Sequence, residues 1–357
     1  MKIVILGLSI TSSWGNGHAT TFRGLVRELS RRGHDVLFLE RDQPWYADNR
    51  DLPDPPWGTT LLYGSLDELH EEHGEVVRDA DLVIVGSYVP DGVRVGDWVQ
   101  QRAQGIKAFY DIDTPVTLAK LARGDHEYLH PRQIPHYDLY LSFTGGPTLQ
   151  RLEREFGAPR ARVLYCSFDP ELYFPEPQEC EWDLGYMGTY SDDRQPSVKA
   201  FLLDTARRHP QGRFILAGPQ YPDAALWPAN VKYAPHLPPA EHRRFYNRQR
   251  FTLNITRQDM IRAGWSPSVR LFEAAACGTP IISDRWPGLE SLLVPHQEIL
   301  LVDRTVDVLD ILQRFGEQER LRMAERARKR ILAQHTAAHR AEELESHAAA
   351  LLSGVAA

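Results

Sequence analysis

Residues 265–284, WSPSVRLFEAAACGTPIISD, decide the fold. A helical apolar pattern runs from Val269 to Ala276 and includes one carboxylate, Glu273. Cys-Gly-Thr-Pro then interrupts the helix, and Ile-Ile-Ser has the composition of a short buried strand. A helix that leads through a glycine turn into a buried strand is typical of an α/β domain with a parallel sheet.

The same alternation extends along the chain in both directions. The pattern predicts strands at 2–8, 34–40, 79–88, 106–113, 137–143, 182–189, 213–219, 251–256, 279–284 and 299–303. It predicts helices at 19–33, 146–157, 196–210 and 269–278, and a helical tail from 306 to about 353. We therefore expect an α/β protein of two Rossmann-like, doubly wound parallel-sheet domains that face each other across a cleft.

A proline- and glutamate-rich stretch separates the two halves. The sequence predicts an N-terminal domain at 1–167, a linker at 168–181 and a second domain at 182–315. The helices of 316–357 are expected to cross back to the first domain. The length of 357 residues suits two domains of ordinary size.

Composition excludes several classes of protein. The formal net charge of −7 argues against binding to nucleic acid or anionic lipid through bulk charge. Three cysteines, with no metal-site spacing, favour a reducing cytoplasm over a disulfide framework. No stretch approaches the roughly 20 apolar residues that span a bilayer, so no integral membrane segment is expected.

The loop after the first strand holds the first candidate site. Gly15-Asn16-Gly17 lets the backbone turn sharply and approach a ligand, so Asn16 and Gly17 are candidates for a sugar contact. His18 opens the next helix, where the positive helix terminus favours a neutral imidazole that can act as a general base. The alternative is a solvated histidine near a helix cap. The chain has no G-x-G-x-x-G here, so NAD is not expected.

A second candidate follows the strand at 106–113. Asp111 and Asp113 are two residues apart, so they share a face and are suited to bind a divalent metal or accept sugar hydroxyls. One of them is alternatively the base. The order Asp113-Thr114-Pro115 also suits a helix cap. We favour capping for one aspartate and a ligand-facing role for the other, and list Asp113 as catalytic and Asp111 as a sugar contact.

The second half offers an anion site. Gly188 and Thr189 end a predicted strand, and Arg194 and Lys199 follow within reach of a diphosphate. Arg257 and Arg270 precede the glycine turn, and Ser268 lies at the start of the helix that carries Glu273. A carboxylate there is suited to accept both hydroxyls of a ribose. The alternative, a solvated surface glutamate, fits poorly because its neighbours are apolar.

These residues resemble a known family. RLFEAAACGTPIISD (270–284) is similar to the nucleotide-sugar segment of group 1 glycosyltransferases of the two-domain GT-B fold. CSFDPELYFP (166–175) resembles the interdomain segment of that family. The first domain resembles the branch related to bacterial spore-maturation (CgeB-like) glycosyltransferases.

The resemblance implies roles for individual residues. Glu273 matches the glutamate that holds the nucleotide ribose. Many retaining members carry a second glutamate eight residues earlier, where this chain has Trp265, which is suited to stack on a sugar face or a base. The triplet Asp111-Ile112-Asp113 resembles the metal-binding motif of the other glycosyltransferase fold, but the two-domain fold usually needs no metal.

We therefore expect a metal-independent transferase of the hexosyltransferase type with no cofactor. Its donor would be a UDP-, dTDP- or GDP-linked sugar, and its acceptor an unidentified glycan, protein or small molecule. His18 or Asp113 would accept the acceptor proton, with His18 preferred. The alternatives are a nucleotide-sugar 2-epimerase and a non-catalytic nucleotide-sugar or glycan-binding protein.

Overall fold

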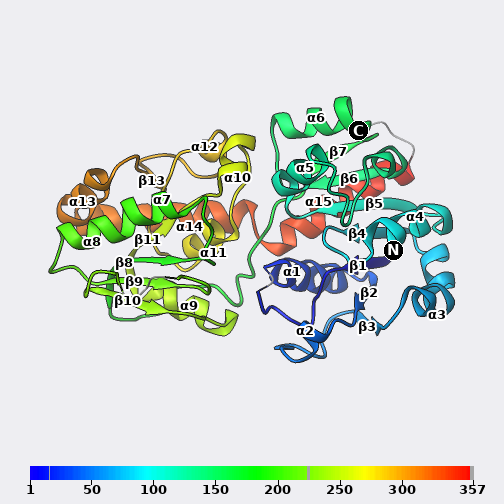
Figure 1. Ribbon diagram of the computed structural model, residues 1–357, viewed down its shortest axis with the longest axis horizontal. Helices are drawn as coiled ribbons and strands as arrows, with labels where there is room; N and C mark the ends of the chain where they lie inside the picture. Colours follow the sequence, from blue (N-terminus) through cyan, green and yellow to red (C-terminus); the bar gives the residue numbers. More distant parts are fainter. Residues whose placement is uncertain (16, 223–225, 354–357) are drawn as a thin grey trace. The chain divides into compact units, whose positions relative to one another are not determined.

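The structure, a computed structural model, describes residues 1–15, 17–222 and 226–353 (Figure 1). It divides into two α/β units. Unit 1 consists of Met1–Ser167 together with the C-terminal segment from Ala337, and unit 2 is Phe168–Thr336. Residues 168–181, which the sequence assigned to a linker, belong to unit 2.

Unit 1 is built on a parallel sheet with the strand order β3-β2-β1-β4-β5-β6-β7. Its strands are β1 Lys2–Gly7, β2 Asp35–Arg41, β3 Thr59–Tyr63, β4 Leu82–Gly86, β5 Ile106–Asp111, β6 Leu139–Ser142 and β7 Ala161–Val163. The central strand β1 is flanked on both sides, with Val4 opposite Leu37 of β2 and Val83 of β4. Continuous apolar runs such as Ile3–Leu6 are buried on both faces, as expected of a parallel sheet.

Helices cover this sheet. They are α1 His18–Arg31, α2 Pro44–Ala47, α3 Leu66–Asp79, α4 Gly92–Arg102, α5 Thr114–Ala122, α6 Pro147–Phe156, a 3₁₀ turn at Pro131–His136, and α15 Ala337–Leu352. Helix α1 ends in a Schellman motif, because Gly33 takes φ +85° and the His34 N–H donates to the Leu29 carbonyl at 3.1 Å. The C-terminal helix α15 packs beside α1 (Figure 1).

Unit 2 repeats the design with the order β10-β9-β8-β11-β12-β13, again parallel. Its strands are β8 Trp182–Met187, β9 Phe214–Ala217, β10 Val231–Ala234, β11 Gln249–Asn254, β12 Ile281–Ser283 and β13 Leu300–Leu301. Its helices are α7 Gln195–Val198, a π-helical turn Lys199–Leu203, α8 Asp204–Arg208, α9 Pro239–Asn247, α10 Gln258–Ala263, α11 Val269–Ala276, α12 Leu289–Leu292, α13 Thr305–Arg314 and α14 Glu317–Gln334.

The strand orders locate the ligand-binding edges. In unit 1 the order reverses between β1 and β4, and in unit 2 it reverses between β8 and β11. Doubly wound sheets bind ligands beyond the carboxyl ends of their strands at such a switch point. The loops after β1 and β4, and those after β8 and β11, are therefore the places to examine.

The fold class predicted from the sequence is confirmed, since both sheets are parallel and doubly wound. The sequence-based prediction missed β3, β7 and β10, which are short strands, and it also missed the amphipathic helices α3 and α4. It also treated 316–357 as one segment, whereas α14 belongs to unit 2 and α15 to unit 1. None of the helices in the described ranges is both long and apolar enough to cross a lipid bilayer.

Candidate functional site

A buried carboxylate fixes the loop after β1 through hydrogen bonds. Glu40, at the carboxyl end of β2, accepts hydrogen bonds from the backbone N–H of Ile10 at 2.7 Å and of Thr11 at 3.0 Å. The hydroxyls of Ser9 and Thr11 donate to its other oxygen at 2.9 and 2.6 Å. This carboxylate is fully buried, so the four donors replace its hydration and fix the start of the loop.

A second acid holds the next turn of this loop. Asp51 accepts from the Ser13 N–H at 2.7 Å and from two N–H groups of Arg23 at 2.8 and 2.9 Å. Beyond it the chain turns at Gly15, with φ +61°, and reaches the exposed Gly17. Asn16, predicted as a sugar contact, lies outside the described residues.

Tyr88 connects the two residues predicted to be catalytic. The His18 ring meets the Tyr88 ring edge-on, with 5.3 Å between centroids. The Tyr88 hydroxyl donates to Oδ2 of Asp113 at 3.1 Å. Burial lowers the pKa of His18 to about 4, so its imidazole is neutral at pH 7. His18 therefore contacts the ring of Tyr88 and Asp113 contacts its hydroxyl, and all three residues lie at the switch point of unit 1.

Asp111 lies inside unit 1. The Thr117 hydroxyl donates to its Oδ1 at 2.6 Å and the Tyr140 hydroxyl to its Oδ2 at 2.7 Å. Burial raises its pKa to about 6. Both oxygens therefore face protein hydroxyls within the core, which gives Asp111 a structural environment instead of the open position that a sugar contact needs.

The capping role expected for one of the aspartates takes an unexpected form. Asp113 occupies the N-cap position of α5, but its side chain makes no capping hydrogen bond. Its carboxylate accepts from Tyr88 instead. The residue is therefore at the predicted position in the chain, with its charge directed to the edge of the sheet that carries His18.

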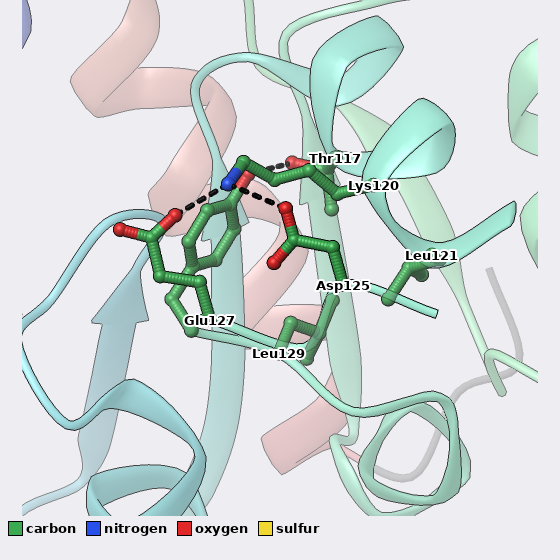
Figure 2. A pocket seen from close by; sticks show the side chains of 7 residues that line it. Thr117, Lys120, Leu121, Asp125, Glu127 and Leu129 are labelled. Carbon is green, nitrogen blue, oxygen red and sulfur yellow. Dashed lines mark hydrogen bonds and ion pairs between the residues drawn. The ribbon is translucent and has the colours of Figure 1, made fainter. Parts of the chain in front are cut away.

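A small, shallow pocket lies beside α5 (Figure 2). Figure 2 shows Lys120 pointing between two carboxylates, and its ammonium lies 3.1 Å from Asp125 and in contact with Glu127. Because the cation is already paired with two acids, this pocket offers no free charge to a ligand. It adds nothing to the site at the switch point.

Arg270 ties together the ligand-binding edge of unit 2. Its Nη1 donates to the Met187 carbonyl at 2.8 Å, and its Nη2 to the Ile255 carbonyl at 2.9 Å. Its Nε donates to the hydroxyl of Ser268, the N-cap of α11, at 3.0 Å. One guanidinium thus joins the ends of β8 and β11 to the start of α11, so its charge sits at the switch point.

Arg194 and Arg257 lie close to this cation. Burial lowers the pKa of Arg194, and the neighbouring charges of Arg270 and Arg257 lower it further. Nη2 of Arg194 donates to the Thr189 carbonyl at 2.5 Å. Its buried Nε has no hydrogen-bond partner among the described residues. Asp193 is an acid near Arg194 and Arg257, and its Oδ2 accepts the N–H of Gln258 at 2.9 Å.

The backbone around these arginines has no room for side chains. A Cβ on Gly188 would lie 2.6 Å from Nη1 of Arg270. Gly218 takes φ +141°, and a Cβ there would lie 2.1 Å from the Gly188 carbonyl oxygen. The glycine predicted as part of the anion site is therefore required by the approach of Arg270. The exposed Thr189 follows it.

Lys199, another predicted diphosphate ligand, has a different environment. It begins the π-helical turn, and its ammonium pairs with Asp204 at 3.2 Å on the same helical segment. Its side chain is largely exposed. Within the described ranges, no contact joins Lys199 to the arginines.

Glu273 is buried, with 3 % of its surface exposed. The Tyr246 hydroxyl donates to its Oε2 at 3.2 Å, and the Tyr173 hydroxyl lies near the carboxylate. Burial raises the pKa of Glu273. The alternative of a solvated surface residue is wrong, and the two tyrosines leave unused lone pairs on the carboxylate.

Trp265 has a left-handed backbone, with φ +43°, which is rare for a bulky residue. Its backbone N–H donates to the Pro287 carbonyl at 2.6 Å. Its ring lies against Gly288, where a Cβ would be 2.4 Å from the indole. The indole at the position of the missing glutamate is therefore half-buried against the loop after β12.

Several residues of these sites were not predicted from the sequence. Tyr88, Glu40, Tyr173 and Tyr246 come from segments far from the motifs that they contact. For Tyr88 one signal was available, since it ends the predicted strand 79–88, at the edge where ligands bind.

Comparisons with known proteins agree with this architecture. Residues 194–346 match a family model described as glycosyl transferase-like. No curated protein matches the chain. The sucrose-phosphate synthase of Thermosynechococcus elongatus has a similar structure, with a TM-score of 0.73 and 15 % identity over 99 % of this chain and 100 % of that chain.

Two further solved structures are similar. HepE of Anabaena in complex with UDP and glucose has a TM-score of 0.71 and 14 % identity, over 98 % of this chain and 100 % of that one. An alpha-glucosyltransferase in complex with UDP-glucose and DNA containing an abasic site has a TM-score of 0.68 and 13 % identity, over 98 % and 99 %. At these identities the likeness shows a common fold. The chain has the GT-B glycosyltransferase fold, and its residues 194–346 match the glycosyl transferase-like family.

Proposed function

We propose that the protein is a glycosyltransferase that takes a sugar from a nucleoside diphosphate sugar. The observation that carries this proposal is the gathering of Arg194, Arg257 and Arg270 at the carboxyl ends of β8 and β11. Three like charges at one edge repel one another, and burial raises the pKa of two of the acids near them, Glu273 and Asp284. A bound anion would relieve this repulsion. The segment that matches the glycosyl transferase-like model begins at Arg194 and includes all three arginines.

The arginines supply what the chemistry requires. A departing nucleoside diphosphate gains negative charge as its bond to the sugar breaks, and fixed positive groups stabilise that charge. The buried Nε of Arg194 has no hydrogen-bond partner among the described residues and is proposed to bind the diphosphate. The backbone of Gly188 and Thr189 lies beside this guanidinium. The start of α11 at Ser268 adds the positive end of a helix.

We assign Glu273 to the ribose. Each carboxylate oxygen accepts two hydrogen bonds, so the tyrosine hydroxyls leave capacity for the two hydroxyls of a ribose. Glu273 follows Arg270 by one turn of α11, which places it next to the proposed diphosphate site. Trp265, one face of which rests on Gly288, is proposed to contact the donor sugar.

Unit 1 supplies the proton acceptor. His18 is neutral at pH 7, which is the form that accepts a proton from a hydroxyl. Asp113, at the other end of Tyr88, is the second candidate. We further propose that the enzyme transfers a hexose without a metal ion. We also propose that it belongs to the spore-maturation branch of the family and is located in the cytoplasm.

Nucleotide binding tests the donor site. We expect UDP, dTDP or GDP to bind the wild type in calorimetry, and Arg194→Ala to weaken that binding at least about tenfold because it removes a buried charge-assisted contact. Arg262→Ala is the matched control, since Arg262 lies on α10 and pairs with Asp259 at the surface. Equal affinity in the two variants, or no binding of any of the three nucleotides to the wild type, would contradict the proposal.

The ribose assignment is tested in the same assay. Glu273→Gln keeps the shape of the side chain and removes its charge, so we expect nucleotide affinity to fall about tenfold. Tyr246→Phe removes one hydroxyl from the same carboxylate and should leave affinity nearly unchanged. If Glu273→Gln binds like the wild type, the glutamate has a structural role only.

Product analysis separates the remaining alternatives. Incubation with UDP-glucose, with and without a panel of glycans, small alcohols and double-stranded DNA, should release UDP and transfer glucose in the presence of one acceptor class. An epimerised sugar without acceptor would identify a 2-epimerase. Tight nucleotide binding without any release of UDP would identify a binding protein. We expect DNA to be inactive because the chain carries a net charge of −7.

A further inference from the structure

Tyr88 has an unusual backbone. It follows β4 at the switch point of unit 1 and takes φ +64°, a left-handed conformation that is a steric outlier for a bulky side chain. Such a residue persists only where the surrounding structure compensates for the strain, and these positions concentrate at functional sites. The strain therefore directs attention to what the Tyr88 side chain does.

Three contacts of the side chain answer this question. Its ring meets the His18 ring edge-on at 5.3 Å, and its hydroxyl donates to Oδ2 of Asp113 at 3.1 Å. On the other side, its ring packs on Tyr128 with 4.5 Å between centroids. An extended backbone at position 88 would carry the ring elsewhere, so the left-handed turn is what places it between His18 and Asp113.

The contacts continue into the core of unit 1. Tyr128 shares a hydrogen bond with the Thr117 hydroxyl at 2.7 Å, and Thr117 donates to Asp111 at 2.6 Å. Among the described residues, the titratable groups near Asp113 include Asp111, Tyr128 and Tyr88, and His18 lies against the Tyr88 ring. Burial raises the pKa of Tyr88, so its hydroxyl keeps its proton and can only donate to the carboxylate.

We propose that Tyr88 is a positioning residue that holds the Asp113 carboxylate ionised and fixes it relative to the His18 imidazole. The proposal deepens the proposed function, since it assigns to one side chain the arrangement of both candidate proton acceptors. A hydrogen bond donated to a carboxylate stabilises its charged form, and a packed ring restricts the orientation of an imidazole. Tyr88 acts through these two groups.

The chain offers a matched pair of variants. Tyr88→Phe removes the hydroxyl that bonds Asp113 and keeps the ring against His18. Tyr63→Phe removes a hydroxyl from another buried tyrosine of unit 1, one that has no hydrogen-bond partner among the described residues. Both variants lose one oxygen atom, so a general effect of losing a buried hydroxyl appears equally in each.

The first readout does not depend on activity. Carboxyl ¹³C resonances of aspartate-labelled full-length protein are followed against pH, and the Asp113 signal is identified by its loss in Asp113→Asn. We expect the midpoint of the Asp113 titration to move up by about one pH unit in Tyr88→Phe and to stay in place in Tyr63→Phe. Equal midpoints in the two variants would overturn the proposal.

The second readout is the rate of UDP release from UDP-glucose. We expect kcat to fall about tenfold in Tyr88→Phe, with the acid limb of its pH profile displaced to higher pH and the affinity for UDP unchanged. An unchanged kcat and profile, in a wild type that binds UDP and releases it from UDP-glucose, would overturn the role of Tyr88 alone. Failure of the wild type to bind any nucleotide would instead contradict the proposed function, and the NMR titration would still decide the Tyr88 proposal.

Discussion

At the scale of single residues, the sites are made of acids and bases whose surroundings decide their charge. Asp111 and His18 lie in the same unit, and burial acts on both. It raises the pKa of the acid and lowers that of the base, because in each case it penalises the charged form. The two effects have opposite consequences for stability between pH 4 and 6.

Asp111 should make the folded state less stable as the pH rises. Its pKa is about 6 when folded, against an ordinary value of 3.8, so the folded state binds more protons in this window. The free energy of unfolding therefore falls with rising pH, by about 3 kcal/mol in total. Asp111→Asn does not titrate, so between pH 4 and pH 7 the wild type should lose about 2 kcal/mol relative to the variant in denaturant unfolding.

Comparing the wild type with Asp111→Asn isolates the contribution of Asp111 to the free energy of unfolding. His18 has a lowered pKa, so its contribution rises as the pH increases from about 4 towards 6.5. This contribution is present in both proteins and cancels in the difference. A difference in unfolding free energy that stays constant from pH 4 to pH 7 would show that Asp111 remains ionised throughout.

At the scale of elements, the pairing of α1 with α15 connects the two ends of the chain. Gly24 of α1 faces Ala337 at the start of α15, and a Cβ at position 24 would lie 3.0 Å from the Ala337 Cβ. Ala341, Leu344 and Ala348 of α15 belong to the same core cluster as Phe22 of α1. Small residues on the facing sides allow the helices to approach, so α15 completes the core of unit 1.

Substitutions on α15 test this role. Leu344 is fully buried, and Leu344→Ala should lower the free energy of unfolding by about 2–5 kcal/mol through lost burial and a cavity. Leu352, on the same helix, is 58 % exposed, and Leu352→Ala should change stability by less than about 0.5 kcal/mol. Urea unfolding followed by circular dichroism measures both. Equal effects would mean that α15 is not part of the core.

At the scale of the whole molecule, the same topology occurs twice with different chemistry. In unit 1 the switch point carries His18, Tyr88 and Asp113, and in unit 2 it carries Arg194 and Arg270. The proposed proton acceptors and the proposed anion-binding arginines therefore lie in separate compact units. This separation predicts that the two functions can be removed independently.

His18→Ala tests that division. We expect it to abolish UDP release from UDP-glucose, or reduce kcat at least about a hundredfold, because a general base is lost. The affinity for UDP measured by calorimetry should remain that of the wild type. A variant that loses nucleotide affinity together with turnover would contradict the assignment of donor binding to unit 2.

The sequence alone determined the features that depend on neighbours in the chain. Strand and helix alternation, the glycine turn after α11 and the helix starts at His18 and Ser268 follow from local periodicity and capping, so they were predicted correctly. The doubly wound fold followed from that alternation. The positions of Glu273, Arg194 and Arg270 in the segment between β8 and β12 were also readable, because they lie within recognisable motifs.

Only the tertiary structure decided which of these side chains are open and which are occupied. Glu273 is engaged by Tyr246, 27 residues away, and Asp111 by Tyr140, 29 residues away. The link between His18 and Asp113 passes through Tyr88, which lies 25 residues before Asp113. Such contacts form when strands or helices distant in sequence pack together, as α9 and α11 do for Tyr246 and Glu273. The local sequence pattern does not show which side chains will then meet.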